Sequence, residues 1–108
     1  MKPSDHLEIV TFGFKNKYNI VSAESHFIVD CRTLPNPWSV RQLRQIDGTD
    51  KRILNYLVEQ DKDEVDRLTS LAVEKYKSGT RHFAFGCVHG KHRSVAIATH
   101  FKNLINNI

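Results

Sequence analysis

The chain has 108 residues, of which 40% are hydrophobic and 26% charged, as expected for one globular domain. This composition excludes collagen-like, low-complexity and mostly disordered proteins. The longest aliphatic run, Val95–Ala98, is far too short to span a membrane, and no apolar segment near Met1 resembles a signal peptide. We therefore expect a soluble, cytoplasmic protein whose two cysteines, Cys31 and Cys87, are free thiols.

Positive charge is concentrated outside one short segment of the chain. The formal net charge is +4, yet six of the twelve carboxylates lie between residues 59 and 74. Two basic residues accompany them, which leaves 14 basic residues against six acidic ones in the remainder. Such a basic surface favours an anionic partner, either a phosphorylated small molecule or a nucleic acid.

Three segments rich in β-branched and aromatic residues are typical of strands. They cover residues 7–14, 26–31 and 81–87. A helical pattern extends from about Asp50 to a stop at Ser78-Gly79, and a last helix begins near Arg93 or Ser94. Because these crossovers are long enough for parallel pairing, we expect a small α/β domain with a mostly parallel sheet flanked by helices. The pattern does not define the strand order.

Two connections and one aromatic pattern complete the predicted fold. Polar residues 15–25 are expected to form a loop or hairpin, and residues 34–48 an ordered loop, because Pro35 and Pro37 end the second strand. We expect Trp38 to anchor this second loop. The alternation of four strand residues predicts that they share one buried face of the sheet: Phe12, Phe14, Phe83 and Phe85.

The segment with the clearest chemistry is the junction between the last predicted strand and the last helix, Cys87–Ser94. Backbone N–H groups at such a junction lack internal partners, and with the positive end of the helix dipole they form an anion site. Gly90 allows the backbone to approach an anion closely, and Arg93 offers a planar donor fork that matches phosphate oxygens. Additional positive charge is expected from three neighbouring side chains: His89, Lys91 and His92.

This segment matches neither a nucleotide triphosphatase P-loop nor a zinc site. Gly86 and Gly90 are separated by three residues instead of four, and His92 stands where Ser or Thr should hold magnesium. The spacing of His89 and His92 from Cys87 matches no common zinc motif. We therefore expect neither a metal nor a cofactor.

The same loop is similar to the Cys-x5-Arg-Ser signature of cysteine-dependent phosphatases. In that interpretation the Cys87 thiolate attacks phosphorus, Arg93 and the loop amides hold the oxygens, and Ser94 helps the thiolate to leave. A general acid would protonate the leaving oxygen, and Asp30 at the end of the second strand is the first candidate. Two other carboxyls stand behind it: Asp47 and Asp50. The alternative is that Cys87 is a small buried residue that closes a strand.

Three sequence blocks occur in an order that resembles the C-terminal domain of the RapZ (YvcJ-type) family. Residues 11–15 are similar to the family's SFGFK, residues 29–37 to FDVRFLPNP, and residues 86–95 to GCTGGxHRSV. The resemblance extends over nearly the whole chain and implies a phosphate-ligand-binding domain over residues 1–108. In that family the domain is an α/β module that binds glucosamine-6-phosphate, takes part in small-RNA binding and self-associates.

The resemblance also implies which residues bind the ligand. The phosphate-holding loop would consist of Cys87, Val88, His89, Gly90, His92, Arg93 and Ser94. Three further residues would lie beside this loop and hydrogen-bond the rest of the ligand: Asp30, Arg32 and Asn36. Lys15, inside the first block, is a further candidate to reach a ligand phosphate.

This chain departs from the family pattern in several respects. Val88-His89 replaces a small Thr-Gly pair, which changes the wall of the pocket and leaves the identity of the sugar phosphate open. Cys31 and Thr33 replace less reactive and bulkier residues. The sequence contains no counterpart of the family's N-terminal nucleotidase domain or of its basic C-terminal tail, so we expect no ATP-handling role.

The leading hypothesis is a non-catalytic module that binds a sugar phosphate or a nucleotide signal as a sensor, adaptor or sink. The resemblance favours a homo-oligomer, and we expect no membrane partner. Two alternatives stay open: a cysteine-dependent phosphatase, and an adaptor that binds small RNA or an RNA-processing protein. Turnover of a phosphate ester would identify the phosphatase, and a steep loss of affinity with salt would identify the RNA-binding adaptor.

Overall fold

The computed structural model describes residues 7–16 and 25–107, so most of the predicted first loop lies outside the described residues. Its strands are β1 (Glu8–Gly13), β2 (Phe27–Asp30) and β3 (His82–Cys87). Within these described residues the helices are α1 (Lys51–Lys77), α2 (Arg93–Ile105) and the short 3₁₀ helices η2 (Pro37–Ser39) and η3 (Arg41–Leu43). The predicted strands and long helices are confirmed, with small differences at their ends.

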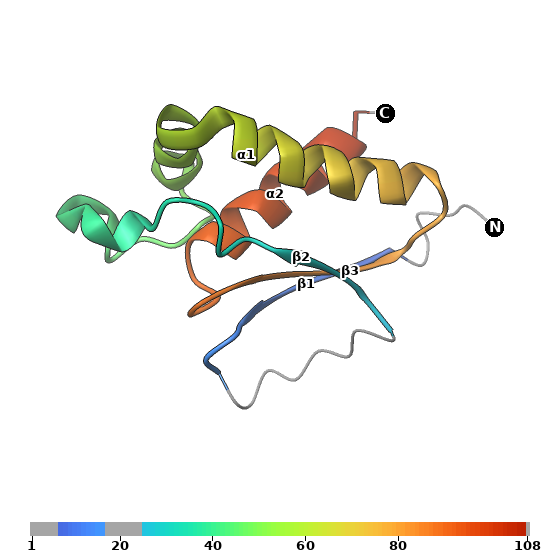
Figure 1. The fold of residues 1–108 in the computed structure, drawn as a ribbon, viewed down its shortest axis with the longest axis horizontal. Helices are drawn as coiled ribbons and strands as arrows, with labels where there is room; N and C mark the ends of the chain where they lie inside the picture. The colour runs from blue at the N-terminus through green and yellow to red at the C-terminus, as the bar shows by residue number, and fades with distance from the viewer. Residues whose placement is uncertain (1–6, 17–24, 108) are drawn as a thin grey trace.

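The three strands form one parallel sheet in the order β1-β3-β2, which confirms the predicted α/β class. β3 is the central strand and is almost entirely buried, as expected for an apolar parallel strand. Both long helices lie on the same side of the sheet (Figure 1). Gly13 pairs with Cys87 and Asp30 pairs with Gly86, so all three strands end together. We call this end, from which the predicted anion loop emerges, the carboxyl edge.

The hydrophobic core lies between the sheet and the two helices. Phe83 and Phe85 of β3 are fully buried, and their ring centroids lie 4.8 and 5.5 Å from that of Phe101 in α2. Burial of each such side chain stabilises the fold by about 1.5–3 kcal/mol. The long helix contributes further buried residues: Ile53, Leu57, Val65, Leu68 and Ala72. β3 is therefore held rigidly where it delivers the chain to the carboxyl edge.

The prediction that four phenylalanines share one face of the sheet is wrong for Phe12 and Phe14. Phe12 pairs with Gly86, which points away from the face that carries Phe85, and its ring covers Gly86 on that opposite side. Phe14 follows the end of β1 and is 40% exposed. The guanidinium of Arg32 lies 3.7 Å from the Phe14 ring centroid, so this side chain belongs to the carboxyl edge and not to the core.

The long helix α1 is interrupted at Asp61, where φ is −157° and ψ is 72°. The Asp61 carboxylate accepts a hydrogen bond from the N–H of Glu64 at 3.2 Å and so caps a second helical segment. Glu64 in turn accepts hydrogen bonds from the Thr33 hydroxyl and, at 2.6 Å, from Arg67. The hydrogen bond between Thr33 and Glu64 holds the chain that follows β2 against α1. No helix among residues 7–16 and 25–107 is long and apolar enough to cross a membrane.

The connection between β2 and α1 is ordered, as predicted, but Trp38 does not anchor it. Trp38 is 53% exposed, whereas Pro37 and Leu43 are buried. Gly48 lies against the first turn of α2, where a Cβ atom would stand 2.4 Å from the carbonyl oxygen of His92. The connection is therefore held by buried apolar residues and by its close approach to α2 at Gly48, and the Trp38 side chain is left at the surface.

Candidate functional site

The candidate site is the loop between β3 and α2, residues 88–92, at the carboxyl edge of the sheet. The end of β1 holds this loop through two backbone hydrogen bonds. The N–H of Phe14 donates to the carbonyl of Cys87 at 2.8 Å, and the N–H of Lys15 donates to the carbonyl of Val88 at 3.0 Å. The predicted residue Lys15 thus lies beside the loop through its backbone, and its side chain is exposed.

Gly90 is the position at which the loop turns. Its φ is +72°, a conformation that side chains rarely adopt but that glycine adopts without strain. A Cβ atom there would stand 2.7 Å from the backbone nitrogen of Gly13 and from the carbonyl carbon of Phe12. Glycine is therefore required here because the loop packs on the end of β1. The sequence analysis had assigned Gly90 to the approach of an anion and did not predict this contact.

Three polar groups converge on the Sγ atom of Cys87. The N–H of Ser94 donates to Sγ at 3.4 Å, the thiol donates to the Ser94 hydroxyl at 3.2 Å, and the N–H of Gly90 is a further donor. Burial raises the pKa of the Cys87 thiol. Hydrogen bonds that the Ser94 hydroxyl and the N–H groups of Ser94 and Gly90 donate to the thiolate, together with the charge of Arg93, bring the pKa below its ordinary value. The loop therefore stabilises negative charge at its centre.

Arg93 lies in the first turn of α2 and is 6% exposed. Its Nη1 atom donates hydrogen bonds to the carbonyl of Arg32 at 3.1 Å and to that of Leu34 at 3.0 Å. These two bonds use both hydrogens of Nη1, so Nε and Nη2 are the donors that the guanidinium retains for an anion. Arg93 thus fastens the chain after β2 to the start of α2, a role that the sequence did not predict.

Asp30 and Arg32, predicted to contact the ligand, form an ion pair with each other. Arg32 Nη2 donates to Asp30 Oδ2 at 2.7 Å, and Arg32 Nε and N–H both donate to Oδ1 at 3.0 Å. Hydrogen bonds from the Arg32 side chain lower the pKa of Asp30. A lowered pKa reduces the fraction of Asp30 that carries a proton at a given pH, which is unfavourable to a general acid.

The two other carboxyls considered as general acids are engaged in local hydrogen bonds. Asp47 accepts from the Thr49 hydroxyl and, at 2.8 Å, from the Thr49 N–H, and these bonds lower its pKa. Asp50 caps α1, and hydrogen bonds from the side chain and N–H of Arg52 lower its pKa to about 2. These lowered pKa values are unfavourable to protonation of a leaving group by either carboxyl.

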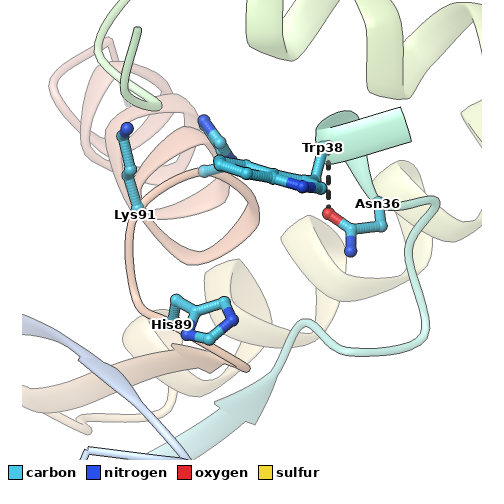
Figure 2. A pocket seen from close by; sticks show the side chains of 5 residues that line it. Asn36, Trp38, His89 and Lys91 are labelled. Carbon is cyan, nitrogen blue, oxygen red and sulfur yellow. Dashed lines mark hydrogen bonds between the residues drawn. The ribbon is translucent and has the colours of Figure 1, made fainter. Parts of the chain in front are cut away.

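A cavity of about 320 Å³ opens beside the loop (Figure 2). It is lined by Asn36, Trp38, His89, Lys91 and His92. Figure 2 shows the Trp38 indole edge-on as one wall, with His89 facing it from the loop and Asn36 at the side. The Oδ1 atom of Asn36 accepts a hydrogen bond from the backbone N–H of Trp38 at 3.1 Å, which ties these two lining residues together.

The charge of the cavity differs from the sequence-based expectation. His92 is 7% exposed, and burial lowers its pKa, so its ring is neutral at pH 7 and the prediction of positive charge is wrong for this residue. The Nε2 atom of His92 is buried and has no hydrogen-bond partner among the described residues. The side-chain nitrogen of Lys91 donates to the carbonyl of Arg44 at 2.8 Å and points away from His89 (Figure 2).

The predicted site residues thus gather at the carboxyl edge in two groups. Residues 87–94 form the loop, with Asn36 beside it, while Asp30 and Arg32 are paired at the end of β2. Sequence reasoning missed Trp38, which it assigned to packing. The available signal was an aromatic residue directly after Pro37, in a connection that leaves the sheet at the edge where ligands of parallel α/β sheets bind.

Comparison with known proteins places the chain in a family. Residues 5–108 match the family described as the RapZ C-terminal domain. Proteins named "Nucleotide-binding protein" from Pseudothermotoga lettingae and Arthrobacter sp. are 37% and 42% identical over 94% and 85% of this chain. One of the same name from Staphylococcus aureus strain Newman is 33% identical over 94% of it. The aligned regions cover 38%, 32% and 35% of these three relatives, so the chain spans about a third of their length. The chain belongs to the RapZ C-terminal domain family.

Proposed function

We propose that this domain binds a small phosphorylated metabolite and that the loop Cys87–Ser94 holds its phosphate. The observation that carries the proposal is the convergence of the Ser94 and Gly90 N–H groups on the Cys87 Sγ atom at the start of α2. A site that lowers the pKa of a buried thiol stabilises negative charge, and the first turn of a helix adds its dipole. The donors that Arg93 retains on Nε and Nη2 would meet the same anion.

The family and the names of the relatives support a phosphorylated ligand without identifying it. The chain belongs to the RapZ C-terminal domain family, for which the expected ligand is a sugar phosphate. The relatives from Pseudothermotoga lettingae and Arthrobacter sp. are named nucleotide-binding proteins, although each is about three times longer than the matched region. The proposed ligand is therefore a sugar phosphate or a nucleotide, and the domain acts as its sensor, adaptor or sink.

Thermal unfolding with a panel of sugar phosphates, nucleotides and cyclic nucleotides tests this proposal. A ligand at 100 times its dissociation constant stabilises the folded state by about 2.7 kcal/mol. For a domain near 100 residues this raises the unfolding midpoint by roughly 10 °C or more. We expect such a shift for at least one ligand, a much smaller one in Arg93→Lys, and an unchanged one in Arg41→Ala. Arg41 is exposed on η3, outside the loop and the cavity, so it controls for the loss of one positive charge.

Silence across the whole panel would contradict the proposal. An equal loss of the shift in Arg93→Lys and Arg41→Ala would also contradict it, because it would point to the overall charge and not to the loop. Inorganic phosphate belongs in the panel, because a site built around one phosphoryl group should bind it weakly. At high concentration it should therefore compete with larger phosphorylated ligands for the same site.

A cysteine-dependent phosphatase is a second candidate, favoured by the lowered pKa of Cys87 and its spacing from Arg93. The lowered pKa of Asp30 is unfavourable to it, as is the engagement of Arg93 Nη1 with two carbonyls. Recovery of the ligand after incubation separates the two functions. A binding module returns the ligand intact, whereas a phosphatase releases inorganic phosphate and loses this activity in Cys87→Ser.

The resemblance to the family also predicts that the domain binds small RNA or an RNA-processing protein and that it self-associates. Both remain predictions. For RNA the measurement is the salt dependence of affinity. A protein that neutralises several phosphates loses affinity steeply between low and moderate salt, whereas a pocket for one phosphate has a shallow dependence.

A further inference from the structure

We propose that Cys87 is a site of reversible oxidation by a hydroperoxide and that Cys31 resolves the oxidised sulfur as an intramolecular disulfide. Both cysteines are free thiols in the structure. Formation of this bond depends on the two thiols and their surroundings, so it does not require that the loop Cys87–Ser94 bind a phosphorylated ligand. The disulfide gives Cys31 a chemical role in addition to its place in the core.

The register of β2 and β3 places the two cysteines side by side. The strands are parallel neighbours (Figure 1), and Asp30 pairs with Gly86. The N–H of Cys31 donates to the carbonyl of Gly86 at 2.7 Å, so the pairing continues one residue past β2 and brings Cys31 opposite Cys87. Neighbouring strands lie about 4.7–4.9 Å apart, and the Cα atoms of a disulfide about 4.4–6.8 Å apart. The backbone spacing therefore suits a bridge.

Both cysteine side chains lie on the side of the sheet that the helices cover. Side chains alternate along a strand, so Cys31 points to the same side as Val29, and Cys87 to the same side as Phe85. Val29 and Phe85 pair with each other and are both fully buried in the core. Cys31 and Cys87 belong to the same buried cluster, at 0% and 3% exposed. No strand therefore separates the two thiols.

Cys87 is the thiol that an oxidant attacks first. Burial raises its pKa, but hydrogen bonds from Ser94 and Gly90 outweigh this effect and lower the pKa below its ordinary value, which favours the reactive thiolate. Cys87 also borders the loop at the carboxyl edge, whereas Cys31 has no exposed surface. A small oxidant such as hydrogen peroxide therefore reaches Cys87 before Cys31.

The reaction has two steps. The Cys87 thiolate attacks one oxygen of hydrogen peroxide, so that an S–O bond forms, the O–O bond breaks, and the departing hydroxide takes a proton from solvent to become water. The product is a neutral sulfenic acid. The Cys31 thiol then attacks the Cys87 sulfur: the S–S bond forms, the S–O bond breaks, and the thiol proton leaves with the hydroxyl group as a second water. A dithiol reductant reverses the process and restores both thiols.

The first step favours the second. Burial raises the pKa of Cys31, and the negative charge of the Cys87 thiolate raises it further. Conversion of this thiolate to the neutral sulfenic acid removes that charge at the moment when Cys31 has to react. The Cys31 thiol donates one long hydrogen bond, to the carbonyl of Val29 at 3.7 Å, which is weak and easily given up. Proximity on neighbouring strands then makes the attack intramolecular.

The test is oxidation of the reduced, folded chain with a small molar excess of hydrogen peroxide. Remaining thiols are alkylated, and the protein is digested with trypsin without reductant and analysed by mass spectrometry. Trypsin separates the two cysteines, because Arg32 and Arg81 lie between them. We expect the intact chain to lose the mass of two hydrogen atoms and to yield a linked pair of peptides containing Cys31 and Cys87. Dithiothreitol should restore both free thiols.

Substitutions separate the attacked thiol from the resolving thiol. Cys31→Val keeps a small apolar side chain in the core, and its fold is checked by circular dichroism. In this variant the sulfenic acid of Cys87 should persist and be trapped by dimedone several-fold more than in the unsubstituted protein. In Cys87→Ser, Cys31 should stay reduced at the same peroxide concentration. Thr33→Val alters the same segment after β2 but retains both thiols, so it should form the disulfide as the unsubstituted protein does.

Three outcomes would overturn the inference. One is conversion of Cys87 to sulfinic acid while Cys31 stays a free thiol in the native protein. Another is equal trapping by dimedone in the unsubstituted protein and in Cys31→Val, because Cys31 would then not resolve the sulfenic acid. The third is a bridge that forms in urea but not in the folded chain, because the native register would then not bring the thiols together. The proposed function is tested separately, by the thermal shift with phosphorylated ligands.

Discussion

Arg93→Ala should destabilise the domain even when no ligand is present. Arg93 is 6% exposed, and its guanidinium joins two chain segments, because Nη1 donates to the carbonyls of Arg32 and Leu34 at 3.1 and 3.0 Å. A hydrogen bond from a charged group contributes about 1.5–3 kcal/mol, and two bonds from one nitrogen are not fully additive. We therefore expect a loss of about 3 kcal/mol in the free energy of unfolding.

Urea unfolding followed by circular dichroism measures this loss. The midpoint should fall while the slope with urea stays unchanged, since the folded state keeps its compactness. A loss of about 3 kcal/mol corresponds to a thermal midpoint lower by roughly 12 °C or more. The midpoint of Arg93→Lys should lie between those of the unsubstituted protein and Arg93→Ala, because one ammonium cannot reproduce the planar donor fork.

The matched control is Arg41→Ala, on an exposed position of η3. It should change the free energy of unfolding by less than about 0.5 kcal/mol, as is usual for surface substitutions. If Arg93→Ala were as mild as this control, the guanidinium would not be holding the segment after β2. Arg93 would then act solely on the ligand, as its position in the loop motif suggests.

Three further predictions concern the loop and its support. Gly90→Ala should lower the free energy of unfolding by about 2 kcal/mol or more, because a Cβ would stand 2.7 Å from the Gly13 nitrogen. The control is Gly79→Ala, at φ +113° with open space around it, which should lower it by about 1 kcal/mol. Equal losses in the two variants would contradict the packing of the loop on β1. An alkylating reagent should modify Cys87 before Cys31, because the pKa of the Cys87 thiol is lowered while burial raises that of Cys31. Mass spectrometry of the digested protein measures the order, and modification of Cys31 first would contradict the stabilisation of negative charge by the loop. Hydrogen bonds from Arg67 and Thr33 lower the pKa of Glu64 to about 2. The contribution of Glu64 to the free energy of unfolding is therefore complete above its unfolded-state pKa of about 4.3 and is lost as the pH falls towards 2. Glu64→Gln should reduce the loss of stability between these two pH values, and an unchanged loss would contradict the contact.

Local patterns predicted the elements because each depends on residues that are close in sequence. The alternation in residues 81–87 and the helical spacing after Arg93 both reflect neighbours along the chain. The strand-to-helix junction at Cys87 followed from the same two patterns. The resemblance to the RapZ family added the prediction of which residues hold the ligand, and membership of the family is confirmed.

Contacts between distant segments were not predictable in this way. The carbonyls that receive the Arg93 hydrogen bonds lie 61 and 59 positions earlier in the chain, so no spacing rule connects them. The face of Phe12 depends on its register with Gly86 in the neighbouring strand, and the buried state of His92 depends on the connection that crosses α2 at Gly48.

Trp38 illustrates a different limit. A tryptophan in a proline-containing loop is usually buried, since its large apolar surface favours packing. Here Pro37 and Leu43 fill the space beneath the connection, and the indole is displaced to the cavity wall. Which residue of such a loop is buried is decided by the volume available under it, and sequence periodicity carries no information about that volume.

The most direct test of the central claim is a titration of the ¹⁵N-labelled protein with inorganic phosphate, followed through its backbone amide resonances. Binding by the loop predicts saturable shifts at residues 89–95, largest for the N–H groups at the start of α2, including Ser94, and small shifts elsewhere. Shifts spread over exposed lysines and arginines across the surface, without saturation at the loop, would contradict the assignment of Cys87–Ser94 as the phosphate site.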